Sequence, residues 1–425
     1  MKLSLIHNIT TRNAYQPVAT GAEGDKKMAF RYYGPMGKGV NSEGMELFDD
    51  LKEGIFQTRP NRFVVECTVE GRNVRAYLPN PGRLTELFLP DSRLLLVKHD
   101  PASGRKLAYT VVAVEKDGVP VMLHTHSTND VARVLIEHDR ISGLEGARIV
   151  KTEHTIGHSR FDFLLSREGR ELVLEVKSCT LFSGRIAMFP DAITDRGRRH
   201  LMELAELSRT GMQTAVLFIV HSPSVDYFMP EHHTDLAFSR TLFDVRHDVM
   251  VKAVGVTWAQ DLRLGSAVRE LSIPWDLVDR ESHDRGSYIV VLRLSRDRVM
   301  EIGDLGKMRF RKGYYLYTGS AKADLTQRIE RHRRITTKVQ GHIDYLRRCA
   351  EWHASFPIRT SDELECDLAS ALGSIAEWSV PGFSAIDCAC ATHLFGMAGD
   401  PLHNAAFIDI LMDFRIRRLE KKIEA

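Results

Sequence analysis

Two short stretches decide the fold: SRFDFLL at residues 159–165 and ELVLEVK at residues 171–177. Both are rich in apolar residues and partly alternating, which predicts two strands, and the glycine-containing segment between them predicts the turn of a hairpin. Alternation places Asp162 on one face of the first strand and gathers Glu175 and Lys177 on one face of the second. Two carboxylates and a lysine on a sheet face suit a hard divalent cation, Mg²⁺ or Mn²⁺, together with a phosphate group.

The same alternation predicts that Phe161, Phe163 and Leu165 lie on the face opposite Asp162. An acid and a lysine two residues apart on a strand usually belong to a solvated face. The order of the neighbouring secondary-structure elements is therefore needed to distinguish an ordinary surface from a functional site. Those elements are predicted as a helix, a strand, the hairpin, a second helix and a strand, at residues 129–138, 148–153, 159–177, 195–209 and 214–220.

This order of elements resembles the core of the PD-(D/E)XK nuclease fold. The resemblance implies that Asp162, Glu175 and Lys177 are catalytic residues. It further implies that Asp162 and Glu175 bind Mg²⁺ or Mn²⁺, while the lysine steadies the attacking water or the phosphate charge. Glu137 and Glu153 are weaker candidates for a further acidic ligand.

Short motifs spread over residues 45–264 resemble the sugar fermentation stimulation protein A family. They are PNPGRL at 79–84, SRFDFLL at 159–165, EVKS at 175–178, FPDA at 189–192, RG at 196–197 and HL at 200–201. The resemblance implies a DNA-binding protein in which an OB-like domain precedes a PD-(D/E)XK-like domain. Asn80 and Arg83 are then candidate nucleic-acid contacts, although Pro81 stands where many members have threonine.

Five strand-like segments follow one another, without helical periodicity, before the nuclease-like region. They lie at residues 62–69, 72–78, 93–97, 108–114 and 119–123, with turn residues between them. This spacing predicts a small β-barrel such as an OB-fold, a fold that commonly binds single-stranded nucleic acid. A scaffold barrel with ordinary solvated basic residues is the alternative.

The composition is that of a globular protein with two or three domains: 425 residues, 43% hydrophobic, 27% charged, with a formal net charge of +2. No apolar run is long enough to span a bilayer, and the six scattered cysteines do not resemble a secreted disulfide framework. We therefore expect a cytoplasmic protein without a membrane partner.

Residues 1–44 are polar and aperiodic, which predicts either a disordered arm or a misassigned extension ahead of Met45. A charged stretch within residues 266–285 is the predicted linker.

Residues 286–425 form a third predicted domain. A Gly-x-Tyr that contains Tyr288 lies on one predicted strand, a Tyr-x-Gly that contains Tyr317 lies on another, and Arg328 lies on the helix that follows. This pattern resembles the GIY-YIG nuclease module. The resemblance implies that either tyrosine positions the water, that Arg328 offsets charge in the transition state, and that Glu365 binds one Mg²⁺. Paired tyrosines and glycines also occur as an ordinary core-and-turn pattern.

Basic residues and cysteines supply the remaining candidates. Predicted DNA contacts are the arginines at the start of one helix and in the densest basic run, with a solvated helix face as the alternative: Arg196, Arg199, Arg331 and Arg334. Candidate ligands for Zn²⁺, with buried free thiols as the alternative, are Cys388, Cys390 and His393, completed by Cys366 or Cys349.

The sequence thus predicts a multidomain α+β chain. Its parts are a small OB-like β-barrel at residues 45–125, a PD-(D/E)XK nuclease-like α/β domain at 126–265 and a GIY-YIG-like α/β domain at 286–425. The predicted function is DNA binding with metal-dependent phosphodiester hydrolysis, with RNA as a further substrate class. The alternative is a non-catalytic DNA-binding regulator of sugar metabolism genes, and the oligomeric state stays open.

Overall fold

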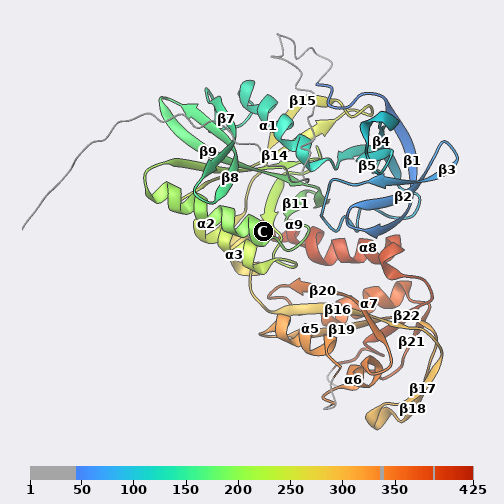
Figure 1. Cartoon of the computed structure of the whole chain (residues 1–425). Coiled ribbons are helices and arrows are strands. Elements are labelled where there is room, and N and C mark those ends of the chain that lie inside the picture. The colour runs from blue at the N-terminus through green and yellow to red at the C-terminus, as the bar shows by residue number, and fades with distance from the viewer. Residues whose placement is uncertain (1–44, 336–338, 386–387, 425) are drawn as a thin grey trace, which may run out of the picture. The chain divides into compact units, whose positions relative to one another are not determined.

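The computed structural model describes residues 45–335, 339–385 and 388–424 (Figure 1). The arm or extension predicted at residues 1–44 lies outside the described residues. Within the described ranges, no helix combines the length and the apolar composition needed to cross a membrane.

Five strands close into a barrel at the beginning of the described chain. The barrel strands and the strand that extends them are β1 (Leu51–Asn61), β2 (Val64–Val69), β3 (Arg72–Tyr77), β4 (Arg93–Lys98), β5 (Tyr109–Lys116) and β6 (Val119–Met122). Antiparallel pairing runs through β3, β2, β1, β4 and β5, and a short parallel pairing in which Ala76 lies opposite Tyr109 closes the ring. The OB-like barrel is therefore present as predicted. Its first strand, β1, lies outside the five predicted segments because only Gly54 and Phe56 in it are buried, which leaves little alternation to detect.

A mixed six-stranded sheet forms the centre of the next domain, in the order β15-β14-β12-β9-β8-β7. The strands are β7 (Arg148–Ile156), β8 (Ser159–Arg167), β9 (Arg170–Cys179), β12 (Gln213–Val220), β14 (Met250–Trp258) and β15 (Leu264–Glu270). β9, β12 and β14 run parallel, and the others pair antiparallel with their neighbours. The predicted hairpin is β8–β9, in which Arg167 lies opposite Arg170 across the turn.

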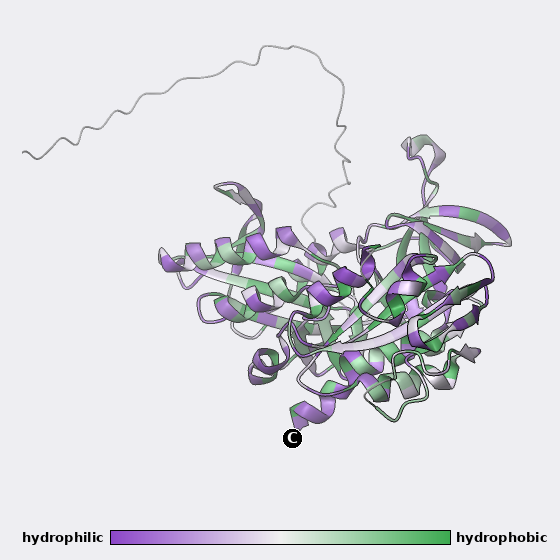
Figure 2. Ribbon diagram, turned by 90° about the horizontal axis from the view of Figure 1, so that it is seen from below, coloured by the Kyte–Doolittle hydropathy of each residue, from purple (hydrophilic) through white to green (hydrophobic). Residues whose placement is uncertain are grey.

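Helices cover both faces of this sheet (Figure 1). They are α1 (Thr128–Glu137) on one face and α2 (Asp195–Arg209) and α3 (Leu236–Val245) on the other. Leu174 of β9 shares a core cluster with Leu135 of α1, whereas Val173 shares the other cluster with Leu204 of α2. The helices in Figure 2 carry both hydrophilic and hydrophobic segments, as expected of helices that bury one face. Since β9 is buried from Leu172 to Val176, a charged residue in that stretch needs polar partners.

Strand alternation is interrupted beside the candidate acid. Phe163 and Leu165 pack in the core that contains α1, but Phe161 packs in the opposite core, where its ring centroid lies 5.6 Å from that of His200. The prediction that all three apolar residues share one face is therefore wrong for Phe161. The reason is that the β8–β9 ladder ends at Phe163, so that β8 is no longer held to β9 where it reaches Asp162.

The segment predicted as a linker, residues 266–285, is largely ordered. It contains the end of β15 and α4 (Trp275–Glu281), in which Leu277 and Val278 are buried. A charged composition did not indicate irregular chain here, because the apolar residues of α4 sit between its charged ones and face the core. Beside the main sheet, β10 (Leu181–Ser183), β11 (Ile186–Phe189) and β13 (Tyr227–Pro230) form a small sheet of their own.

The C-terminal domain is built on a five-stranded sheet in the order β20-β16-β19-β22-β21. Its strands are β16 (Gly286–Leu294), β19 (Gly313–Ala321), β20 (Glu351–Arg359), β21 (Trp378–Ser379) and β22 (Leu394–Met397), and β17 (Arg298–Glu301) pairs separately with β18 (Lys307–Phe310). Its helices are α5 (Leu325–Arg333), α6 (His342–Arg347), α7 (Glu365–Ile375), α8 (Ala405–Met412) and α9 (Arg418–Glu424). Val290 of β16 packs with Ile329 of α5 and Ile289 packs with Leu368 of α7, so that helices cover both faces. The described chain is thus multidomain α+β, a barrel followed by two α/β domains, as predicted.

Candidate functional site

Asp162 occupies the point where β8 and β9 separate. Its Oδ2 accepts the Val176 backbone N–H at 2.8 Å, and its Oδ1 accepts from Asn129 Nδ2 of α1 at 2.8 Å. Burial and the neighbouring charge of Glu175 raise the pKa of the Asp162 carboxyl above its usual value. The carboxylate therefore accepts a hydrogen bond from a backbone N–H of β9 beyond the end of the β8–β9 ladder. Its position is fixed by β9 and by α1.

Glu175 is almost fully buried and faces α2. Its Oε1 accepts from Lys177 Nζ and from His200 Nδ1, the latter at 2.6 Å. Burial opposes its ionisation, but the hydrogen bond from His200 and the charge of Lys177 outweigh burial and hold the pKa of the Glu175 carboxyl below its usual value. Its second oxygen, Oε2, is buried without a hydrogen-bond partner. A buried carboxylate oxygen in this state has an unmet need for a proton or a cation.

The first turn of α2 supports this arrangement. Thr194 caps the helix by accepting the Gly197 N–H at 3.0 Å, which fixes where the helix begins. Arg196 Nε lies 3.4 Å from His200 Nε2, one helical turn away, so the predicted DNA contact Arg196 touches the histidine that holds Glu175. Arg199, the second predicted contact on this helix, is exposed.

The donor set fits a hard divalent cation. Asp162 and Glu175 offer oxygen atoms that Mg²⁺ and Mn²⁺ prefer, and Glu175 Oε2 has no other partner. The two weaker candidates are set differently: Glu137 is exposed at the end of α1, and Glu153 is exposed and pairs with Arg160 at 3.6 Å. Among the described residues, neither forms a close group of three metal ligands with Asp162 and Glu175.

The motif at residues 79–84 folds back onto Asp191. Asn80 is buried and accepts the Gly82 N–H at 2.9 Å, and the Leu84 N–H donates to Asp191 Oδ2 at 2.6 Å. Leu84 holds a positive φ of 54°, a costly conformation for a branched side chain, which the hydrogen bond to Asp191 helps to maintain. Asn80, a predicted nucleic-acid contact, is thus turned inward and braces the loop.

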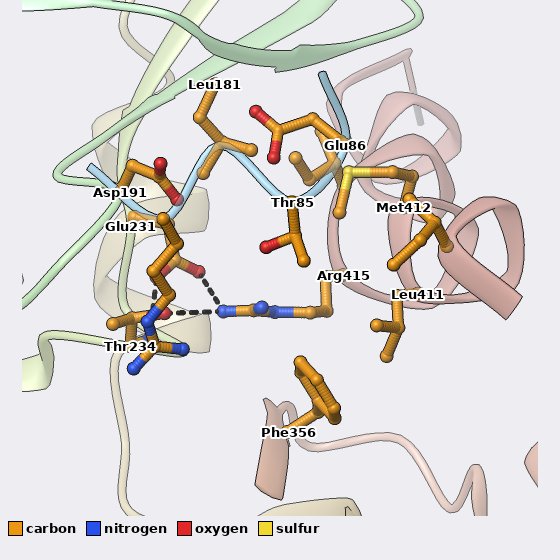
Figure 3. Close-up of a pocket in the computed structure, with 13 residues that line it drawn as sticks. Thr85, Glu86, Leu181, Asp191, Glu231, Thr234, Phe356, Leu411, Met412 and Arg415 are labelled. Carbon is orange, nitrogen blue, oxygen red and sulfur yellow. Dashed lines mark hydrogen bonds and ion pairs between the residues drawn. The ribbon is translucent and has the colours of Figure 1, made fainter. Parts of the chain in front are cut away.

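Arg83, the other candidate in this motif, lines a small cavity of about 20 Å³ that is bordered by both charged and apolar residues (Figure 3). Arg415 spans the cavity and donates to Glu231 Oε1 at 2.9 Å and to Thr234 Oγ1 at 2.7 Å. Burial and the nearby Glu86 raise the pKa of Asp191 well above its usual value. The cavity has room for about one water molecule and no more.

A second polar cluster lies in the C-terminal domain and contains the two predicted tyrosines. The Tyr288 hydroxyl is 2.8 Å from His332 Nε2 and 3.4 Å from Arg328 Nε, and the Tyr288 and Tyr317 ring centroids are 6.2 Å apart. Burial raises the pKa of both phenols. The structure therefore brings together Tyr288, Tyr317 and Arg328, and adds His332, which was not among the predicted site residues.

Glu365 stands at the first residue of α7, close enough for its charge to raise the pKa of Tyr317 further. Its Oε2 accepts from the Ser320 hydroxyl, and its Oε1 lies 3.5 Å from His393 Nδ1. The carboxylate is half-buried, so one side of it still faces solvent, from which a cation could be bound. The nearby basic candidates differ: Arg331 donates to the buried Asp344 at 3.1 Å, whereas Arg334 is exposed at the end of α5.

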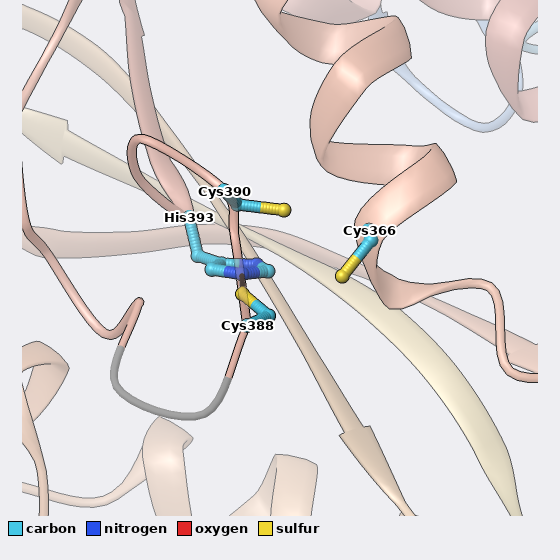
Figure 4. Close-up of side chains that lie close together, drawn as sticks. All are labelled: Cys366, Cys388, Cys390 and His393. Atoms are coloured by element: carbon cyan, nitrogen blue, oxygen red, sulfur yellow. Dashed lines mark hydrogen bonds between the residues drawn. The ribbon is translucent and has the colours of Figure 1, made fainter.

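The predicted zinc ligands lie together in space (Figure 4). Cys366, Cys388, Cys390 and His393 place their ligand atoms within 4.8 Å of one another. Cys366 is therefore the fourth candidate ligand, since Cys349 is an exposed cysteine outside this group. Burial and the neighbouring thiols raise the pKa of Cys390 to about 12.

Three polar residues of these clusters were not predicted as site residues. His200 stands in a quoted motif, and its spacing of four residues from Arg196 on a helix was the available signal for its role. Asn129 begins the predicted first helix, but only the fold shows that it reaches Asp162. His332 lies on α5, and its pairing with Tyr288 depends on how α5 packs on β16.

Comparison with known proteins accounts for nearly the whole described chain. Residues 58–123 match the SfsA N-terminal OB domain, residues 126–261 the sugar fermentation stimulation protein RE domain, and residues 287–415 the domain of unknown function DUF123. The sugar fermentation stimulation protein homolog of Methanothermobacter thermautotrophicus is 37% identical over 54% of this chain and 96% of its own length. The homolog of Chloroflexus aurantiacus is 41% identical over 46% of this chain and 75% of its own.

A solved structure gives the same assignment. The Pyrococcus furiosus SfsA structure in complex with Ca²⁺ is 30% identical, with a TM-score of 0.50, over 54% of this chain and 98% of that chain. The barrel and the nuclease-like domain together correspond to that relative, and the DUF123 region lies beyond them. The chain belongs to the sugar fermentation stimulation protein (SfsA) family and carries a C-terminal DUF123 domain.

Proposed function

We propose that this protein binds DNA and hydrolyses phosphodiesters in a metal-dependent reaction, with Asp162, Glu175 and Lys177 as the principal site. The observation that carries the proposal is the state of Glu175. One of its oxygens is held by Lys177 and His200, and the other is buried without a partner beside a second carboxylate. Burying an unsatisfied carboxylate oxygen costs folding free energy, and a bound cation is the usual compensation.

Asp162 and Glu175 would hold Mg²⁺ or Mn²⁺. When bound, the cation polarises the phosphate and lowers the pKa of a coordinated water. Lys177 contributes a positive charge next to Glu175, which steadies the water or the developing charge on the phosphate. His200 keeps Glu175 oriented by donating to Oε1. The Pyrococcus furiosus relative was solved in complex with Ca²⁺, a cation that prefers oxygen ligands, and this supports the proposal of a divalent cation here.

The rival function is a DNA-binding regulator that uses a nuclease fold only to grip the duplex. Binding alone gains nothing from carboxylates placed near phosphates, because like charges repel. The retained acid–acid–lysine set therefore favours an enzyme.

A second, independent phosphodiesterase site is proposed at Tyr288, Tyr317, Arg328 and Glu365. Its supporting observation is the geometry: Arg328 Nε lies 3.4 Å from the Tyr288 hydroxyl, and the ring centroids of Tyr288 and Tyr317 are 6.2 Å apart. Glu365 accepts from Ser320, which lies on the same strand as Tyr317. DNA is the proposed partner and RNA the second candidate, with backbone contacts from the exposed arginines Arg83, Arg196, Arg199 and Arg334. Asn80 and Arg331 are already engaged in hydrogen bonds inside the protein and would act by holding the binding surface.

Six free thiols fit a reducing compartment, and we place the protein in the cytoplasm.

Incubation of the full chain with labelled single- and double-stranded DNA and RNA, with Mg²⁺, Mn²⁺ or EDTA, tests the proposal. We expect cleavage of at least one substrate with Mg²⁺ or Mn²⁺ and none with EDTA. Binding of DNA without metal-dependent cleavage of any substrate would establish the regulator instead.

A further inference from the structure

We propose that Cys366, Cys388, Cys390 and His393 bind a zinc ion that ties the start of α7 to the chain before β22. Cys366 belongs to the first turn of α7, and the other three residues lie within six positions just ahead of β22. These two segments are brought together by the fold and not by sequence proximity (Figure 4). The site is separate from the acids at β8 and β9 and does not depend on the proposed nuclease function.

The geometry is close to that of a tetrahedral metal site. Zinc lies about 2.3 Å from sulfur and about 2.0 Å from imidazole nitrogen, so neighbouring ligand atoms of a tetrahedral site are roughly 3.5–3.8 Å apart. Cys388 Sγ is 3.1 Å from His393 Nε2, and all four ligand atoms lie within 4.8 Å of one another. Only small side-chain rotations separate this arrangement from a closed four-ligand site.

The histidine is already oriented as a metal ligand. Its Nδ1 lies 2.8 Å from Thr318 Oγ1 and 3.5 Å from Glu365 Oε1, while its Nε2 faces Cys388. A proton on Nδ1 leaves the Nε2 lone pair free for the metal, and a carboxylate behind the histidine is a recurring arrangement at zinc sites. The backbone of His393 is fixed as well, since its N–H donates to Phe383 O and its carbonyl accepts from Thr318 N.

The donor set selects zinc over the hard cation proposed for Asp162 and Glu175. Three thiolates and one imidazole favour a borderline-soft ion, whereas Mg²⁺ and Ca²⁺ prefer oxygen. Each thiol gives up a proton when it ligates, so binding releases protons to solvent. Four protein ligands leave no position for water, which is typical of a structural site.

Zinc at this position also bears on Glu365. The carboxylate is held between Ser320 and His393, so fixing the imidazole fixes one of the two partners of Glu365. The carboxylate that faces Tyr317 is therefore positioned through the zinc ligand. An open groove of about 610 Å³ borders Cys366 and Cys390 and gives solvent and chelators access to the site.

Metal analysis of the full chain purified with added zinc provides the test. We expect about one zinc per chain, a marked loss in Cys388→Ser and no change in Cys349→Ser, which alters an exposed cysteine outside the cluster. Cys388→His restores a ligand and should recover zinc, which guards against a loss caused by misfolding. Wild-type protein without zinc, zinc content equal in Cys388→Ser and Cys349→Ser, or iron in place of zinc would each overturn the proposal.

Two further readouts do not depend on activity. Co²⁺ in place of zinc should give the intense visible absorption of a tetrahedral thiolate site, and Cys388→Ser should lack it. Removal of zinc with a chelator should speed hydrogen exchange at residues 365–368 and 388–394, with little change in the β8–β9 hairpin. Unchanged exchange at both segments would contradict the role of zinc in holding α7 and Glu365.

Discussion

Glu175 on β9 and His200 on α2 are joined by a hydrogen bond of 2.6 Å between Oε1 and Nδ1, and both side chains are almost fully buried. Because a carboxylate only accepts hydrogen bonds, the histidine proton must lie on Nδ1. His200 Nε2 is then free to accept from Arg196. The hydrogen bonds from Arg196 to His200 and from His200 to Glu175 fix one oxygen of Glu175, while its other oxygen, Oε2, has no hydrogen-bond partner.

Replacing His200 should weaken metal binding without removing a metal ligand. We expect His200→Ala to lower the affinity for Mg²⁺ or Mn²⁺ by roughly 10- to 100-fold, as is usual when the partner of a ligand is lost. His200→Asn, which keeps a donor, should lose less. The measurement is the metal concentration that gives half-maximal stabilisation against heat. Equal metal affinity in wild type and His200→Ala would show that the histidine does not position Glu175.

Asp162→Asn should abolish cleavage and yet stabilise the protein at neutral pH. A carboxyl whose pKa is raised by folding binds its proton more tightly in the native state than in the unfolded state. Stability therefore falls as pH rises from the unfolded value of about 3.9 through the raised native pKa, and the full cost is present above it. Asparagine does not ionise and so carries no such cost, and Asn129 can turn its own amide so that its oxygen accepts from the new amide group.

We expect Asp162→Asn to raise the free energy of unfolding at pH 7 in EDTA. The gain should shrink as pH is lowered toward 4. Thermal unfolding of both proteins across this pH range measures it, and a variant that is less stable than wild type at pH 7 would contradict the raised pKa. Added Mg²⁺ should stabilise wild type more than the variant.

Arg415→Met should destabilise the protein strongly. Arg415 donates to Glu231, which is 1% exposed, and removing the cation leaves a buried charge with only the backbone N–H groups of His233 and Thr234 as donors. Breaking a buried pair in this way costs about 3–5 kcal/mol. The double variant Arg415→Met/Glu231→Gln should recover part of the loss. Denaturant unfolding measures both, and a double variant no more stable than the single one would argue against an unpaired charge as the cause.

Arg196→Ala should weaken DNA binding through lost charge. If Arg196 contacts a phosphate, the dependence of log affinity on log salt should become shallower by about one unit, with little sequence preference. Arg170→Ala is the matched control, because Arg170 is an exposed arginine at the turn end of the same hairpin that carries Glu175. Fluorescence anisotropy at several salt concentrations gives the slopes. Identical slopes in both variants would remove Arg196 from the interface.

The sequence was most informative where the same element carries both a clear pattern of apolar residues and the candidate catalytic side chains. The hairpin of β8 and β9 was predictable because apolar runs flank a short turn, and it carries Asp162, Glu175 and Lys177. Strand β1 was not predictable because few of its side chains are buried. The position of Phe161 also escaped the pattern, since alternation assumes a regular strand and the ladder to β9 ends two residues later.

Contacts between distant elements account for the rest. Nothing local in the sequence indicates that Asn129 reaches Asp162 or that Arg331 is paired with Asp344. The choice of Cys366 over Cys349 likewise depends on how α7 lies beside β22. Such pairings join residues that are far apart in the sequence, and they become visible only when the packing of the folded chain is known.

Direct comparison of Glu175→Gln with Glu171→Gln tests the central claim. Both variants replace one glutamate on β9, but Glu171 is exposed and lies outside the site. On the best-cleaved substrate with Mg²⁺ or Mn²⁺, we predict that Glu175→Gln loses cleavage by ~100-fold or more, which corresponds to about 2.7 kcal/mol or more of lost transition-state stabilisation, while DNA binding is kept. Glu171→Gln should cleave like wild type. Cleavage by Glu175→Gln at the wild-type rate would contradict the account.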